Sequence, residues 1–186
     1  MKKHKAARFL MISTVLFVQL IFLLMIIKEQ YESNNFATIL SIIAVTLVLI
    51  SGYKYLDLHH EEYVYENISV VVWVPIGAVI CYLLNTSTDL GSVLSVGITG
   101  AVASLLPSID QKSDYFNKLP AAIYCGAFIG MSSVKIAPSI GFVIAAGILA
   151  GLFFMLAKNL FVGIGGKFGS IAFGSMVIIS LINWLL

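Results

Sequence analysis

Charged side chains are scarce in this chain of 186 residues. They make up 11% of its residues, whereas soluble globular domains carry about 25%. Hydrophobic residues account for 60%. This composition excludes an ordinary soluble protein and predicts an integral membrane protein. The net charge of +2 is too small to indicate nucleic acid as a partner.

Cysteine is also scarce. The chain has two cysteines, Cys81 and Cys125, and both lie in apolar stretches without a further Cys, His or carboxylate at ligand spacing. We therefore expect both to be buried as small apolar side chains. No disulfide, metal site or other cofactor is predicted.

Long apolar runs, in contrast, are abundant. Seven of them occupy residues 9–27, 36–53, 68–84, 90–109, 119–134, 140–157 and 168–186. About 20 helical residues cross a bilayer, and the alternation typical of barrel strands is absent. The sequence therefore predicts an all-α, polytopic membrane helix bundle of about seven transmembrane helices. The first run is too long for a cleaved signal peptide, so we expect it to be retained.

Basic residues are unevenly distributed among the loops. If the amino terminus is cytoplasmic, nine Lys and Arg residues lie inside, and Lys28 and Lys135 lie outside. By the positive-inside rule we expect a multi-pass protein of the cell inner (plasma) membrane with a cytoplasmic amino terminus. A re-entrant segment at 119–134 is the alternative, but it reduces the bias to seven against four.

Glycine separates two regions of a single membrane domain, residues 1–186. Thirteen of the fifteen glycines follow residue 90, so residues 1–89 are predicted to form bulky peripheral helices and residues 90–186 a glycine-rich core. Small residues recur there at helical spacing, which predicts close helix packing. A weak match between the fifth and seventh runs leaves open a repeat of two helical hairpins.

Two prolines bear on helix geometry. Pro75 lies inside the third run and is expected to kink that helix, because it leaves a carbonyl near Val71 without its partner. Pro120 is expected in the first turn of the fifth helix, where a missing N–H costs little.

The segment "NLFVGIGGKFGS", residues 159–170, contains four glycines and one lysine between apolar runs. It lacks the spacing of a phosphate-binding loop that holds a nucleotide. Exposed amides beside Lys167 could attract an anion, with residues 160–166 inserted as a half-loop that lines a vestibule. Alternatively, Lys158 and Lys167 only extend to the lipid headgroups while the glycines turn the chain.

The segment "DLHHEEYVYE", residues 57–66, holds the only cluster of His and carboxylate residues. A divalent metal is one interpretation, but adjacent histidines point apart. A solvated loop is the favoured prediction.

The apolar runs have no Asp or Glu near their centres, which disfavours transport coupled through a carboxylate. Hydroxyls and backbone groups remain to line a polar path. The candidate residues lining a pore or contacting the solute are Ser95, Thr99, Ser104, Tyr124, Gly126, Gly130, Ser132, Ser133, Gly165, Gly166, Lys167, Ser170 and Gly174.

These features lead to two functional hypotheses. The first is a small membrane channel or facilitator for a small anion or neutral solute, with a path through the glycine-rich carboxy-terminal helices and a homo-oligomeric assembly. The alternative is an accessory or assembly subunit of a membrane protein complex. An enzyme is not expected, because the runs contain no central base to pair with Ser or Cys.

Overall fold

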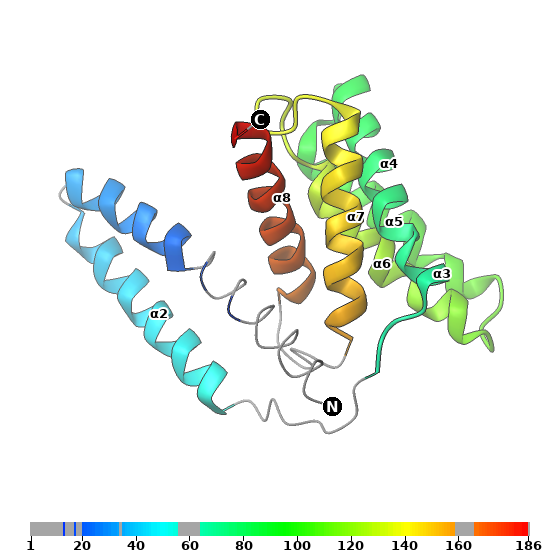
Figure 1. Ribbon diagram of the computed structural model, residues 1–186, viewed down its shortest axis with the longest axis horizontal. Helices are drawn as coiled ribbons and strands as arrows, with labels where there is room; N and C mark the ends of the chain where they lie inside the picture. The colour runs from blue at the N-terminus through cyan, green and yellow to red at the C-terminus, as the bar shows by residue number, and fades with distance from the viewer. Residues whose placement is uncertain are drawn as a thin grey trace. The chain divides into compact units, whose positions relative to one another are not determined.

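The computed structural model describes residues 13, 17, 20–33, 35–55, 64–158 and 166–185. This part of the chain consists of helices and connecting loops and contains no strand, which confirms the predicted all-α class. Contacts divide the chain into two compact units, Met1–Tyr63 and Val64–Leu186. Figure 1 shows the helices of each unit.

The first unit contains two helical segments in its described part. Residues 20–32 are helical, and α2 follows at Phe36–Tyr55. The Asn35 N–H donates to the Gln30 carbonyl at 3.0 Å as the first helix ends. The Asn35 side chain then accepts a hydrogen bond from the Thr38 N–H at 3.4 Å, so one residue closes the first helix and caps the second.

The second unit is a bundle of helices that run in alternating directions (Figure 1). Its elements are α3 (Ile68–Val71), α4 (Trp73–Ser87), α5 (Gly91–Ser104), the 3-10 turn η1 (Leu106–Ser108), α6 (Asp114–Gly130), α7 (Ile140–Leu156) and α8 (Lys167–Leu185). The most extensive contact joins α4 and α6, followed by that between α4 and α7. α5 packs beside α4 and α6, and α8 beside α6 and α7.

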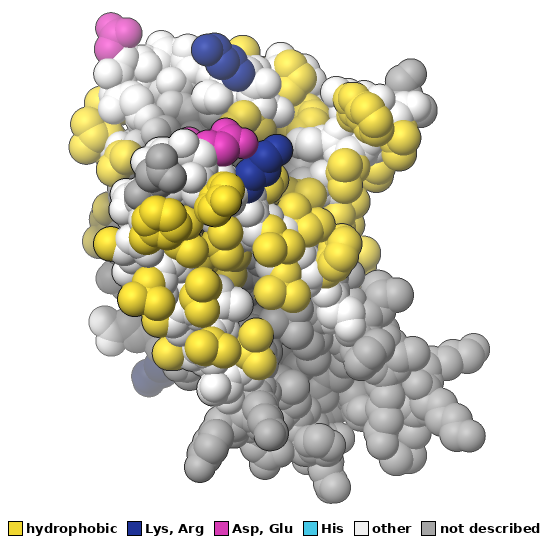
Figure 2. All heavy atoms as spheres, turned by 90° about the vertical axis from the view of Figure 1, so that its left-hand side faces the viewer, with side chains coloured by type: hydrophobic (Ala, Val, Ile, Leu, Met, Phe, Trp, Pro, Cys, Tyr) yellow, Lys and Arg dark blue, Asp and Glu magenta, His cyan; other side chains and the backbone are white. Residues whose placement is uncertain are grey.

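Within the described residues, three helical segments are long and apolar enough to cross a membrane: Ile68–Ser87, Gly91–Ser108 and Lys167–Leu185. α7 is apolar but shorter. Many large hydrophobic side chains are exposed on the described surface, as Figure 2 shows for one face. These properties are those of a membrane protein, whose exposed helix faces contact lipid.

Every predicted apolar run coincides in part with helical residues, and α6 differs most from its prediction. It begins at Asp114, five residues before the run 119–134, so Pro120 lies inside the helix and the prediction of a first-turn proline is wrong. The helix extends into a polar segment because Asp114 in its first turn interacts favourably with the helix dipole. α6 is a single helix of 17 residues, and it is not among the segments that are long and apolar enough to cross a membrane.

The helix that contains Pro75 is interrupted close to where the sequence predicts. α3 ends at Val71 and α4 begins at Trp73. Proline has no N–H to donate to the carbonyl four residues earlier, which is that of Val71. The single helix expected from hydropathy is therefore present as two pieces.

The glycine face of α6 packs on the backbone of α4. A Cβ atom added at Gly126 would overlap the Val74 carbonyl oxygen and lie 2.8 Å from the Ala78 nitrogen. One added at Gly130 would overlap the Ala78 carbonyl oxygen and lie 2.6 Å from the Tyr82 nitrogen. These contacts are backbone to backbone, so only glycine allows the two helices to approach so closely.

Two glycines of α7, Gly147 and Gly151, face the same helical segment. A Cβ atom at Gly147 would lie 2.8 Å from the Pro75 Cα, and one at Gly151 would lie 3.1 Å from a Val71 methyl carbon. α3 and α4 fall in the region 1–89 that the sequence predicts to be peripheral. In the structure they are the surface on which both glycine faces pack.

Several other glycines make no close contact with a neighbouring backbone among the described residues. A Cβ atom added at Gly97 on α5, or at Gly169 or Gly174 on α8, would meet no atom of the described residues within 4 Å. At Gly100 it would meet the Tyr124 ring at 2.8 Å. Close backbone packing is thus a property of glycines of α6 and α7, while Gly169 and Gly174 of α8 form no such contact with the described residues.

Candidate functional site

Four charged residues from separate segments meet at one end of the second unit. Glu66 precedes α3 by two residues, and Lys118 lies in the second turn of α6. Lys158 follows α7 by two residues, and Lys167 is the first residue of α8. The alternating helix directions bring these ends together. We call Glu66, Lys118, Lys158 and Lys167 the charged cluster.

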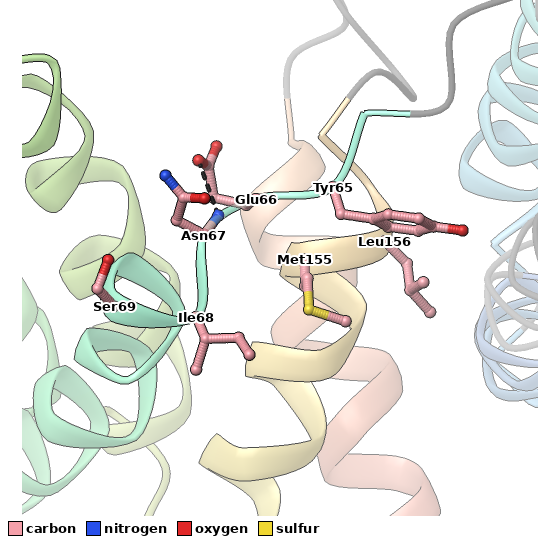
Figure 3. A pocket seen from close by; sticks show the side chains of 7 residues that line it. All are labelled: Tyr65, Glu66, Asn67, Ile68, Ser69, Met155 and Leu156. Atoms are coloured by element: carbon pink, nitrogen blue, oxygen red, sulfur yellow. Dashed lines mark hydrogen bonds between the residues drawn. The ribbon is translucent and has the colours of Figure 1, made fainter.

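Glu66 is the centre of the charged cluster and is 8% exposed. Its N–H donates to the Met155 carbonyl at 3.2 Å, which fixes the chain against the end of α7. Its Oε1 atom accepts a hydrogen bond from the Asn67 N–H at 3.2 Å (Figure 3). Two ammonium groups face the same oxygen, with Lys158 Nζ at 3.3 Å and Lys118 Nζ at 3.8 Å. A buried carboxylate requires such partners, because an unpaired buried charge is strongly destabilising.

The three lysines of the charged cluster differ in their partners. Lys118 also pairs with Asp114, one helical turn earlier. Mainly because Asp114 accepts a hydrogen bond from it, the pKa of Lys118 is raised above its ordinary value of 10.5. Lys167 is half-buried, and its Nζ donates to the Lys158 carbonyl oxygen at 3.2 Å. Among the described residues, the hydrogen-bond acceptor of Lys167 is thus a neutral group.

A shallow, open groove of about 550 Å³ lies next to Glu66. It is lined by Tyr65, Glu66, Asn67, Ile68, Ser69, Met155 and Leu156. Figure 3 shows these side chains on the chain entering α3 and on the last turn of α7. The lining of the groove therefore contains apolar side chains together with Glu66, the carboxylate of the charged cluster.

The sequence placed Glu66 in a solvated loop with residues 57–65, and for Glu66 this prediction is wrong. Its side chain is buried and ion-paired across 92 positions to Lys158. Residues 56–63, with the two histidines of the metal hypothesis, lie outside the described residues. Within the described part, no group of three or more His, Cys, Asp or Glu side chains could hold a metal ion.

The predicted hydroxyl residues of α5 bond to their own helix. Ser95 Oγ donates to the Gly91 carbonyl and Thr99 Oγ1 to the Ser95 carbonyl, each at 2.8 Å. Ser104 Oγ donates to the Ala101 carbonyl at 2.6 Å. Ser and Thr commonly bond to a preceding carbonyl in this way within helices, which leaves fewer donors for a solute.

Other candidates lie in helix contacts or in the loop after α6. Gly126 and Gly130 pack on α4, where neighbouring backbone fills the space that a solute would need. The Tyr124 ring stacks edge-on against Phe128, with 4.6 Å between ring centroids. Ser132 and Ser133 follow α6 at the end opposite to the charged cluster, and the Ser132 carbonyl accepts a hydrogen bond from an Asn85 amide at 3.1 Å.

The remaining candidates belong to α8 and the segment before it. Gly166 has a φ of +85°, a conformation that favours glycine, and its carbonyl accepts a hydrogen bond from the Ser170 N–H at 2.9 Å. Lys167 belongs to the charged cluster, Gly174 is buried on α8, and Gly165 lies outside the described residues. None of the thirteen candidates lines the groove.

Cys81 and Cys125 are both buried, as predicted, and each has a free thiol. Cys81 packs with Val96 and Ala127 at the contact of α4, α5 and α6.

Comparisons of the chain with protein-family models, curated proteins and solved structures found no match.

Proposed function

We propose that the protein is a small integral membrane channel or facilitator for a small anion or neutral solute, with the charged cluster at one mouth of its path. The observation that supports this most is the pairing of Lys118 and Lys158 with one buried carboxylate, with a third lysine, Lys167, bonded to the Lys158 carbonyl beside them. Such a surplus of positive charge raises the local concentration of anions. The proposal places the protein in the cell inner membrane, with the charged cluster on the cytoplasmic side.

The glycine contacts support a path outside the contact of α4, α6 and α7. α4, α6 and α7 approach too closely for a solute to pass between them, because backbone atoms occupy the space beside Gly126 and Gly130. Gly97 and Gly169, in contrast, have no described atom within 4 Å of an added Cβ. We therefore place the path along α5 or α8, with a second copy of the chain completing its wall.

Flux into sealed vesicles tests this proposal. The full-length protein is reconstituted, and vesicle shrinkage is recorded under gradients of a halide salt and of an uncharged osmolyte. We expect flux above that of empty vesicles. If the path carries anions, Lys158→Gln should lower the halide flux about fivefold. This factor corresponds to about 1 kcal/mol, the electrostatic contribution of one lysine near the membrane surface. Lys135→Gln, which removes the same charge from the loop after α6, should leave the flux unchanged.

The absence of flux above empty vesicles, with insertion verified by protease accessibility, would contradict the proposal. An effect of Lys135→Gln equal to that of Lys158→Gln would also contradict it, because the charged cluster would then have no special role.

The second candidate is an accessory or assembly subunit of a membrane complex. It is favoured by the closed packing of α4, α6 and α7 and by the absence, in the described residues, of buried side-chain N or O atoms without a hydrogen-bond partner. Such an interior offers no empty polar site to a solute. This candidate predicts no flux and a heterogeneous or aggregated protein when the chain is purified alone, whereas a channel should be monodisperse.

A further inference from the structure

Acidic residues are missing from the carboxy-terminal part of the chain. Residues 115–186 contain four lysines and no Asp or Glu. Three of these lysines belong to the charged cluster, where Glu66 is the buried carboxylate. Asp114 is 80% exposed and pairs with Lys118. Among the residues that the structure describes, the charge at Lys158 and Lys167 is therefore only partly balanced.

Within the described part of the chain, Lys118 and Lys158 have carboxylate partners within 4 Å, and Lys167 has none. It is half-buried, and its acceptor is the neutral carbonyl of Lys158. The connecting residues 159–165 contain no acid in their sequence, so they cannot supply a carboxylate. Partial burial removes water from an ammonium group at a cost in free energy, which an anion bound nearby would offset.

The charged cluster also lies at the ends of the apolar segments. Glu66 is two residues from the start of Ile68–Ser87, and Lys167 begins Lys167–Leu185. Lys158 is two residues beyond the end of α7. In a protein that spans the bilayer, helix ends lie at the level of the lipid phosphates, and basic pockets between helices bind phosphate-bearing headgroups there.

We propose that Lys158 and Lys167 together bind a phosphate group, and that Glu66 positions the Lys158 ammonium from the opposite side. The phosphate belongs either to an anionic lipid headgroup or to free inorganic phosphate. For a lipid, the apolar wall of the groove beside Ile68, Met155 and Leu156 accommodates the start of an acyl chain. This binding does not require transport, so it goes beyond the proposed function.

Calorimetric titration of the full-length protein in micelles tests this site. The probes are inorganic phosphate, short-chain phosphatidylglycerol and short-chain phosphatidylcholine, whose net charge is zero. We expect saturable binding of phosphatidylglycerol or of inorganic phosphate, and weaker binding of phosphatidylcholine. Lys158→Gln and Lys167→Gln should each weaken binding about fivefold, as expected for loss of one lysine close to an anion. Lys135→Gln is the matched control and should bind as the wild type does.

A further variant separates a binding role from a structural one. Glu66→Gln removes the negative charge beside the site while keeping the shape of the side chain. If the lysines bind an anion, this variant should bind it more tightly, even where the free energy of unfolding falls. If the charged cluster only holds helices together, the variant should lose stability without any gain in affinity, and the proposal would be overturned.

The outcomes also identify the source of the phosphate. If inorganic phosphate binds saturably and competes with phosphatidylglycerol, the site accepts both free phosphate and a lipid headgroup. If phosphatidylglycerol binds and inorganic phosphate does not, the site is specific for lipid. Equal affinities for the wild type, Lys158→Gln and Lys167→Gln would overturn the proposal, as would no binding by monodisperse, helical wild-type protein. Because no vesicle flux is measured, this result is independent of the transport experiment.

Discussion

Adding one methyl group at Gly126 is the most direct test of the packing between α4 and α6. In Gly126→Ala the new Cβ atom overlaps the Val74 carbonyl oxygen and lies 2.8 Å from the Ala78 nitrogen. Both are backbone atoms of α4, so no side-chain rotation can relieve the overlap. The two helices must separate, although they share the most extensive contact of the bundle.

The expected magnitude follows from two opposing effects. Overpacking a well-packed interior costs about 1–3 kcal/mol, and a clash with rigid backbone belongs at the upper end of that range. Replacing glycine by alanine inside a helix otherwise gains about 0.5–1 kcal/mol. We therefore expect Gly126→Ala to lower the free energy of unfolding by about 2 kcal/mol. Gly97→Ala, which meets no described atom within 4 Å, should leave it unchanged or raise it slightly.

The measurement is an unfolding titration with sodium dodecyl sulfate in mixed micelles, followed by circular dichroism and tryptophan fluorescence. Wild type, Gly126→Ala and Gly97→Ala are compared under the same conditions. If the two variants are equally stable, the backbone contact between α4 and α6 does not exist as described. A loss confined to Gly97→Ala would show that α5, rather than α6, carries the close packing.

Two further predictions concern single side chains. Tyr82 is buried and its hydroxyl donates to the Ala137 carbonyl at 2.8 Å, so Tyr82→Phe should cost about 1 kcal/mol in the same titration, and an unchanged midpoint would contradict this bond. Cys81 and Cys125 are fully buried, so neither should react with a maleimide in mild detergent and both should react after denaturation; labelling of either thiol in the folded protein would contradict the packing around α4 and α6.

Sequence periodicity was sufficient to predict the helical class and the packing role of two glycine faces. Hydrophobicity and residue spacing are local properties, and both determine which face of a helix can approach another backbone. Gly126 and Gly130 lie four positions apart, as do Gly147 and Gly151, and each pair does face another helix closely.

Spacing does not determine what a face meets. Gly174 follows the same small-residue spacing on α8 as Gly130 on α6, but only Gly130 lies against the α4 backbone. The role of α4 was missed because its residues are mostly bulky. One local signal was present: Gly77 is among the few glycines before residue 90, and a Cβ atom there would lie 2.9 Å from the Ile123 Cα.

The charged cluster could not be predicted from the sequence, for a related reason. Lys158 and Lys167 were recognised individually, but the carboxylate partner of Lys158 lies 92 positions earlier, in a segment that the sequence describes as polar. Hydropathy assigns such a segment to water, whereas pairing across the fold decides whether Glu66 is buried. The proximity of Glu66 to the start of an apolar run was the available indication, because helix ends in a bundle lie beside one another.

The packing in the middle of the bundle and the charges at its end depend on the same helices. Glu66 leads into α3 and α4, Lys118 belongs to α6, and Lys158 follows α7, so the three segments joined by the glycine contacts also carry the central ion pairs. A separation of α4 from α6 would move Lys118 away from Glu66, and a shift of α7 would move Lys158. The close glycine contacts therefore set the positions of the ammonium groups as well as the stability of the bundle, so substitution of a glycine far from any charge is expected to alter the proposed anion site.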